Sequence, residues 1–186
     1  MMTRLLSLLM IVLMVAACNK DDDDTANALI NFDGNNFSGP LLDIGDHEAA
    51  VRFPASMMSQ YTDQKLDQIS FYILNPPVSC IIKIYDNGSN TQPGSLLYQA
   101  DVTNAVRSQR WHEHDITRDI NIDGNDLWIS IALGHDIEMQ SIGCDSGPAE
   151  NGGDWLLDAA DGLWIPYNIR TPESVNWNIR ARLRTE

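Results

Sequence analysis

Apolar and polar residues alternate most regularly near the end of the chain, over residues 175–184. One set of alternate positions is apolar: Val175, Trp177, Ile179, Ala181 and Leu183. The other set is polar or basic: Asn176, Asn178, Arg180, Arg182 and Arg184. Because successive side chains of a strand point to opposite faces, this pattern predicts an antiparallel strand with one buried face.

Shorter segments with the same period, or with short apolar runs, recur along the chain between turns rich in Gly, Pro and Asn. Pro54 suits the first turn of one short helix near residues 55–61. The segments 65–74 and 78–85, joined by a short turn, are expected to be adjacent strands. The predicted fold is all-β, a single antiparallel β-sandwich of the jelly-roll kind over residues 28–186. The predicted strands are 28–32, 48–53, 65–74, 78–85, 95–102, 110–117, 126–133 and 175–184.

The first residues form a pattern of a different kind. Arg4 precedes an apolar run over residues 5–15, which is of signal-peptide length and too short to span a bilayer comfortably. The following Ala16-Ala17-Cys18 resembles the bacterial lipobox, in which the cysteine is acylated. We therefore expect a signal peptide at 1–17, an acylated Cys18, and a tether over 18–27. The alternative is an ordinary secreted signal followed by an incidental cysteine.

An acidic run follows the cysteine at once, made of Lys20, Asp21, Asp22, Asp23 and Asp24. This run looks like the surface-export signal of Bacteroidota lipoproteins, although like charges also keep a plain linker extended and solvated. The export interpretation predicts a lipid-anchored, surface-exposed protein of the outer membrane, with that membrane as its partner.

The charge composition argues against one class of partner, and the cysteine content raises the question of a disulfide. Twenty-six acidic residues against twelve basic ones give a net charge of −14. Because nucleic acid is bound through basic surfaces, it is not expected as a partner. Outside the reducing cytosol, Cys80 and Cys144 are candidates for a disulfide. The alternative is that both are small buried apolar residues.

Several side chains are candidates for a binding site. Trp155 and Trp164 lie between Gly-rich turns and could form an exposed aromatic platform for a sugar or a protein. His112 and His114 share a strand face and could bind a metal, but the favoured interpretation is an exposed or sheet-packed histidine pair. The basic positions of 175–184 are interpreted as protection of an edge strand or as a groove for an anionic ligand.

Established catalytic motifs are absent from the sequence. It contains no Gly-x-Ser-x-Gly, no phosphate-binding loop and no His-Glu-x-x-His. Residues 119–124 have the opening spacing of an EF-hand, but Ser130 stands where that loop needs a glutamate. The chain is therefore not expected to be an enzyme.

Two further segments carry a family resemblance, 143–149 (Gly-Cys-Asp-Ser-Gly-Pro-Ala) and 176–180 (Asn-Trp-Asn-Ile-Arg). Over about residues 48–184 the chain resembles a module of secreted Bacteroidota proteins. That module is similar to domains found beside cleaved-adhesin and gingipain-haemagglutinin repeats and in type IX secretion substrates. The resemblance implies a jelly-roll-like extracellular accessory or adhesin unit, with no cofactor other than a candidate calcium ion at Asp145 and Asp154.

Together these features predict a non-catalytic surface lipoprotein that binds an extracellular glycan or protein. The alternative is a structural lipoprotein that assembles with outer-membrane or fimbrial machinery. A metal-dependent hydrolase is a third hypothesis.

Overall fold

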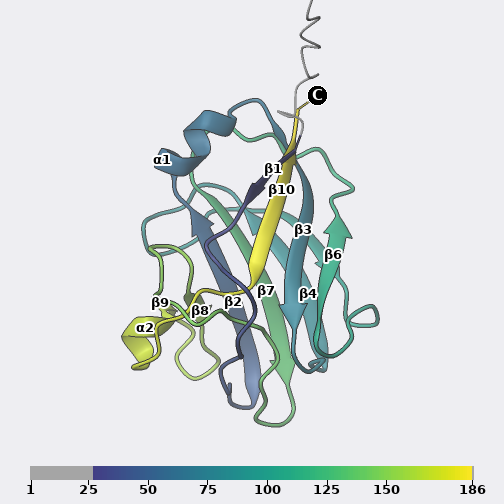
Figure 1. Cartoon of the computed structure of the whole chain (residues 1–186), viewed down its shortest axis with the longest axis vertical. Coiled ribbons are helices and arrows are strands. Elements are labelled where there is room, and N and C mark those ends of the chain that lie inside the picture. Colours follow the sequence, from purple (N-terminus) through teal and green to yellow (C-terminus); the bar gives the residue numbers. More distant parts are fainter. Residues whose placement is uncertain (1–26, 186) are drawn as a thin grey trace, which may run out of the picture.

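The computed structural model describes residues 27–185, so the predictions for Cys18 and for Lys20 to Asp24 lie outside the described residues. Within this range the chain forms two antiparallel sheets packed face to face, which confirms the predicted all-β sandwich (Figure 1). The first sheet contains, in order, β1 (Asn27–Ile30), β10 (Ile179–Arg184), β3 (Lys65–Ile73) and β6 (Arg110–Asp115). The second contains β5 (Leu96–Asp101), β4 (Ser79–Tyr85), β7 (Leu127–His135), β2 (Gly45–Phe53), β8 (Trp155–Leu157) and β9 (Trp164–Pro166).

Helical structure is confined to short segments. The predicted helix near 55–61 is present as α1 (Ala55–Met58), which continues into a 3-10 turn at Ser59–Tyr61. Its first amide is held by Asp126, whose Oδ1 accepts a hydrogen bond from Ala55 N at 2.7 Å. The sequence did not reveal α2 (Tyr167–Arg170), nor β8 and β9. Three-residue strands are too short to show a period.

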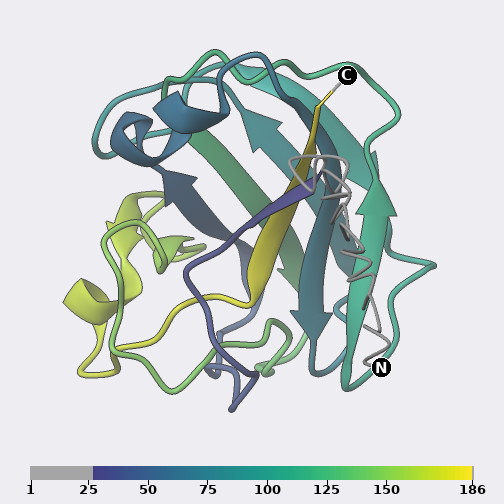
Figure 2. The same cartoon turned by 45° about the horizontal axis from the view of Figure 1, so that its top comes forward.

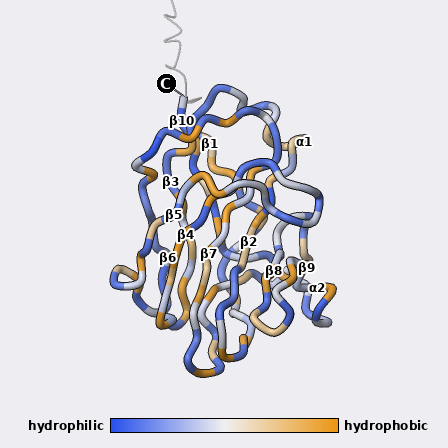
Figure 3. Tube along the Cα trace, turned by 180° about the vertical axis from the view of Figure 1, so that it is seen from behind, coloured by the Kyte–Doolittle hydropathy of each residue, from blue (hydrophilic) through white to orange (hydrophobic). Residues whose placement is uncertain are grey.

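The core lies between the two sheets, where the apolar positions of each strand meet. All five apolar positions of 175–184 are buried, as the alternation predicted, but the polar Asn176 and Asn178, which precede β10, are buried as well. Figure 3 shows the same alternation as orange and blue segments along the strands. Each fully buried aliphatic side chain contributes about 1.5–3 kcal/mol relative to an exposed one, so these strands provide much of the driving force for folding.

Two predictions about strand neighbours are wrong. Segments β3 and β4 follow each other in the chain but belong to different sheets. Strand β3 ends at the turn Asn75-Pro76-Pro77, because prolines cannot donate the hydrogen bonds that would extend a sheet. The chain then passes from the first sheet to the second. Strand β10 is not an edge strand either, since β1 pairs with one side of it and β3 with the other.

The sandwich has two distinct ends. Asn27 at the start of β1 pairs with Arg184 at the end of β10, so both leave the fold at the same end (Figures 1 and 2). Beyond the opposite end of β10, three loops meet through isolated bridges that join Cys144 to Ser38 and to Trp177. In the range 27–185, no helix is long and apolar enough to cross a membrane.

Candidate ligand-binding site

A buried carboxylate holds these three loops together. Asp145 accepts hydrogen bonds from the backbone amides of Gly34, Gly147 and Asn176, at 3.1, 2.8 and 2.8 Å, and from the side-chain amide of Asn176 at 3.0 Å. Burial alone would raise the pKa of Asp145, but these hydrogen bonds outweigh it and hold the pKa below the ordinary value. The carboxylate therefore stays ionised and cross-links segments far apart in the sequence.

Asn176 extends this cross-link to the residues that follow Gly147. Its Oδ1 accepts a hydrogen bond from Glu150 N at 2.7 Å, and its Nδ2 donates to Pro148 O at 3.0 Å. Gly147 has a φ of +70°, and a Cβ at this position would lie 1.8 Å from the carbonyl oxygen of Ser174. Only glycine fits there, so the loop 144–149 packs directly against 174–176.

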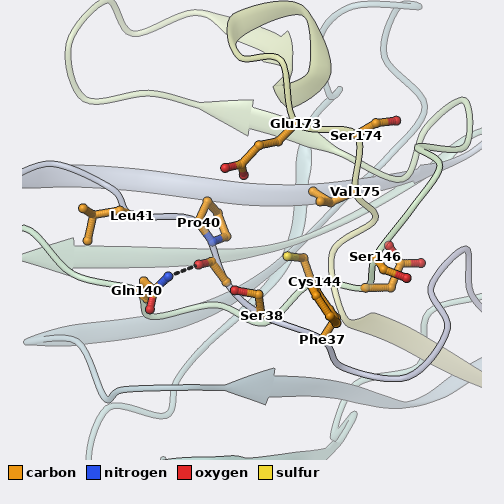
Figure 4. Close-up of a pocket in the computed structure, with 12 residues that line it drawn as sticks. Phe37, Ser38, Pro40, Leu41, Gln140, Cys144, Ser146, Glu173, Ser174 and Val175 are labelled. Carbon is orange, nitrogen blue, oxygen red and sulfur yellow. Dashed lines mark hydrogen bonds between the residues drawn. The ribbon is translucent and has the colours of Figure 1, made fainter.

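A surface cleft of about 430 Å³ opens beside this cross-link (Figure 4). Figure 4 shows the Glu173 side chain directed toward Pro40 across the opening. The ring of Phe37, 75% exposed, lies at the rim. The cleft is lined by Phe37, Ser38, Gly39, Pro40, Leu41, Gln140, Cys144, Asp145, Ser146, Glu173, Ser174 and Val175.

The chemistry of the lining is mixed. Hydroxyl groups of Ser38, Ser146 and Ser174 lie among apolar side chains, while Gln140 Nε2 is committed to Gly39 O at 2.6 Å. The volume falls in the range of sites that hold a small molecule or one segment of a polymer. An apolar rim with hydroxyl and carboxylate groups suits a ligand that has both an apolar face and hydroxyl or amide groups.

The cysteine that lines the cleft is not an activated nucleophile. Burial, then the neighbouring carboxylates of Asp145 and Glu173, raise the pKa of the Cys144 thiol to about 12. A thiolate is the reactive form of cysteine, and at neutral pH this thiol remains protonated.

The candidate disulfide is absent, because Cys80 and Cys144 are both free and buried. Cys80 lies on β4 opposite Leu133 of β7, whereas Cys144 bridges two loops. The alternative considered from the sequence, two small buried apolar residues, describes them correctly. Burial and Asp101 raise the pKa of Cys80 to about 12 as well.

The structure brings Trp155 and Trp164 together but does not expose them as a platform. Both pack against Trp128, Trp155 in a tilted arrangement and Trp164 edge to face, with ring centroids 5.2 and 5.9 Å from it. Trp155 is only 6% exposed, and Trp164 is half-buried. The prediction of an exposed loop platform is wrong, because both residues lie in the short strands β8 and β9, where Trp155 packs beside the small side chain of Ala50.

Both carboxylates considered for calcium accept hydrogen bonds from the protein backbone. Asp154 is buried, and its Oδ2 accepts a hydrogen bond from Asn168 N at 2.9 Å. Burial raises the pKa of Asp154 even though this hydrogen bond opposes the shift. Asp145 is already surrounded by N–H donors. No cluster of three or more His, Cys, Asp or Glu residues suited to a metal occurs within 27–185. The arrangement therefore favours a structural role for both carboxylates.

The histidine pair of β6 is likewise bound to protein groups. His112 Nε2 lies 3.0 Å from Arg107 N, and His114 Nε2 lies 2.8 Å from the hydroxyl of Tyr98. A second pair has the spacing of a nucleophile and its base, since Ser141 Oγ lies 2.8 Å from His135 Nε2. Both residues are buried, so no substrate can reach the hydroxyl.

The basic residues of β10 are neutralised by acids. Arg180 pairs with Asp33 at 2.8 Å, while Arg182 and Arg184 share Asp67 at 2.8 and 3.2 Å. Because β10 is an interior strand, these charges do not protect an edge.

No family model matches the chain, and no curated protein matches it, so the resemblance to the Bacteroidota module stays a prediction. Solved structures with a similar fold include two of Cwp84, a surface layer associated protein of Clostridium difficile. One is of its cysteine protease and lectin-like domains, with 13% sequence identity and a TM-score of 0.62. The other is of the clostridial cysteine protease Cwp84 after propeptide cleavage, with 13% identity and a TM-score of 0.64.

Each match covers 88% of this chain but only 37% and 41%, respectively, of the Cwp84 chains. The chain thus spans about two fifths of the proteins that it resembles. At this identity the likeness shows a shared fold and leaves the activity open.

Proposed function

We propose that this chain is a non-catalytic cell-surface module that captures an extracellular glycan in the loop cleft beside Asp145. The observation that carries the proposal is the cleft itself, in which an exposed aromatic ring, Phe37, and a carboxylate, Glu173, line one opening. Aromatic rings stack on the apolar faces of sugar rings, and carboxylates accept hydrogen bonds from sugar hydroxyls.

The rigidity of the cleft supports this proposal. A preformed site loses less conformational entropy on binding than a flexible loop does. The hydrogen bonds of Asp145 and Asn176 fix the wall that contains Cys144 and Ser146 before any ligand arrives. The lectin-like domain named for Cwp84 agrees with a sugar-binding use of this fold.

The position of the cleft supports a surface role. We propose that Cys18 carries the lipid and that Lys20 to Asp24 direct export, as their sequence pattern predicts. The chain enters the sandwich at Asn27, beside Arg184, and the cleft lies beyond the other end of β10. A domain held from the Asn27 end would present the cleft away from the membrane.

A protein partner is the second candidate. Three large apolar side chains, Leu41, Ile44 and Ile137, are more than half exposed on loops at the cleft end. Exposed apolar groups gathered in one region commonly mark protein interfaces. This observation favours the assembly role as the alternative to glycan capture.

Glycan-array binding tests the proposal. Phe37→Ala should weaken binding about tenfold, because the stacked ring contributes about 1 kcal/mol or more. Glu173→Gln should also weaken binding, since it replaces a charged acceptor. Leu163→Ala is the matched control, because this side chain is also exposed but lies outside the cleft. If wild-type protein binds glycans and both cleft variants bind equally well, the cleft is not the site. If no glycan binds, and a membrane partner is recovered whose binding is lost in Ile137→Ser, the assembly role is correct.

A further inference from the structure

The outer face of the four-stranded sheet contains a second groove, with a volume of about 250 Å³. Strand register explains how it forms. Ser70 on β3 faces Arg180 on β10 and Glu113 on β6, and Gln68 faces Arg182. These five side chains and Trp111 of β6 line most of the groove.

Trp111 forms a fixed aromatic wall of this groove. The guanidinium of Arg180 lies 4.1 Å from the centroid of its ring, and Tyr72 packs edge-on at 5.8 Å. Arg180 is itself held by the buried carboxylate of Asp33 and by the carbonyl of Gly34, both at 2.8 Å. Arg180 covers one face of the indole, so the ring is held in position without any ligand and can contact a sugar only with its remaining surface.

The charges of the groove argue against an anionic ligand. Asp33 neutralises Arg180, and Asp67 neutralises part of the charge of Arg182. The exposed carboxylate of Glu113 faces the groove and would repel an anion. The hypothesis of an anionic-ligand groove, drawn from the basic residues alone, is therefore not favoured.

Polar groups in the groove remain available to a ligand. Neither the Ser70 hydroxyl nor the Glu113 carboxylate makes a hydrogen bond with another residue of the described range. Gln68 Nε2 donates a hydrogen bond to Asp115 Oδ1 at 2.7 Å, which fixes the orientation of the Gln68 side chain in the groove. An acceptor, a hydroxyl and guanidinium donors beside an aromatic wall match the alternating hydroxyls and apolar face of an uncharged sugar ring.

We propose that this groove is a second binding site, for one neutral sugar residue, separate from the loop cleft. Its volume is smaller than that of a typical drug-sized site, so it suits a single ring of a glycan. Two weak sites on one rigid module raise the affinity for a polymer that reaches both of them, because binding at the second becomes intramolecular.

Titration of ¹⁵N-labelled protein with neutral sugars, followed by the indole N–H signals, tests this inference. The probes are glucose, galactose, mannose and N-acetylglucosamine, with glucuronic acid as the charged comparison. We expect at least one neutral sugar to shift the Trp111 indole signal, which Trp111→Phe identifies by its disappearance. Glu113→Gln should weaken that binding about tenfold. Glu138→Gln, an exposed charge change outside both sites, should leave it unchanged.

Two results would overturn the inference. The first is a Trp111 signal that no neutral sugar shifts at about 100-fold molar excess over protein, with the sugar at a concentration on the order of tens of millimolar, as weak binding requires. The second is tighter binding of glucuronic acid than of every neutral sugar. Phe37→Ala separates this proposal from the first one. It should weaken capture at the loop cleft about tenfold and leave the Trp111 shifts intact, so either site can fail without the other.

Discussion

Asp33 illustrates how single residues stabilise this fold. Its side chain is fully buried, which is costly for a carboxylate unless donors surround it. Four groups supply them: Asn178 Nδ2 at 2.7 Å, Asn31 Nδ2 at 3.2 Å, and the Nε and Nη2 atoms of Arg180 at 3.0 and 2.8 Å. Because Arg180 also stacks on Trp111, this one carboxylate supports the second groove as well as the loop that follows β1.

Asp33→Ala should therefore lower the free energy of unfolding by about 3 kcal/mol or more, since Arg180 and Asn178 lose a buried carboxylate acceptor and keep only the carbonyl of Gly34. Urea denaturation measures this loss. Asp119→Ala is the matched control, because Asp119 is exposed and its pair with Lys65 at 3.5 Å lies on the surface. A similar small effect of both substitutions would contradict the role given to Asp33.

His135 makes stability depend on pH. Its buried ring contacts Ser141 Oγ at 2.8 Å, Asp43 O at 3.2 Å and the His47 ring at a centroid distance of 5.3 Å. Burial, aided by His47 and opposed by the Asp43 carbonyl, lowers the pKa of His135 from its ordinary value of 6.5. The folded state then binds fewer protons than the unfolded state as the pH falls below 6.5, so stability is lost in that direction.

Urea midpoints at pH 7.5 and pH 5.5 check this expectation. The midpoint of the wild type should fall between these values, and His135→Gln should reduce the fall, because glutamine does not titrate. His114 has a lowered pKa too, caused mainly by burial, so part of the dependence should remain in the variant. His112→Gln, a substitution at a surface ring, is the comparison. An equal fall in wild type and His135→Gln would show that His135 does not carry the effect.

At the scale of the element, the sequence predicts faces better than it predicts neighbours. The alternation of 175–184 identified every inward side chain of β10, since period depends only on the strand itself. The alternation could not show that β1 pairs with the free side of β10, or that β3 and β4 belong to different sheets, because strand pairing depends on distant segments. The candidate site could not be predicted from the sequence for the same reason. Asp145 and Asn176, 31 residues apart, meet only through the folded loops.

The short strands β8 and β9 change the expected role of Trp155. Its glycine neighbours suggested an exposed loop, but pairing with β2 places it against Ala50 and Trp128. Trp155→Ala should lower the free energy of unfolding by about 3–5 kcal/mol while ligand binding persists below the new melting temperature. Thermal unfolding and glycan binding, measured together, check this. Ile169→Ala, at an exposed position of α2, should change neither. Loss of binding by folded Trp155→Ala protein would restore the platform hypothesis.

At the scale of the whole molecule, the fold separates the end where β1 begins from the loop cleft that we propose as a glycan site. Asn27 and Arg184 lie at one end, and the loop cleft lies beyond the other. Figure 1 shows β1 and the C-terminal end of β10 side by side at one end of the sandwich. With a net charge of −14, the chain also resists non-specific association with anionic surfaces. Both features agree with the proposal that the domain is held at its Asn27 end and captures a glycan in the loop cleft.

Cysteine labelling on intact cells tests this orientation, because both native thiols of the described domain are buried and have pKa values of about 12. They should react little with a membrane-impermeant maleimide, whereas Ile137→Cys places a thiol on the exposed loop end. We expect strong labelling of this variant on intact cells.

Neutral residues in place of Lys20 to Asp24 should confine labelling to permeabilised cells, and Cys18→Ala should release the protein from membranes. Undiminished labelling of intact cells after the first change would refute the export signal, and retention in membranes after the second would refute the lipid anchor.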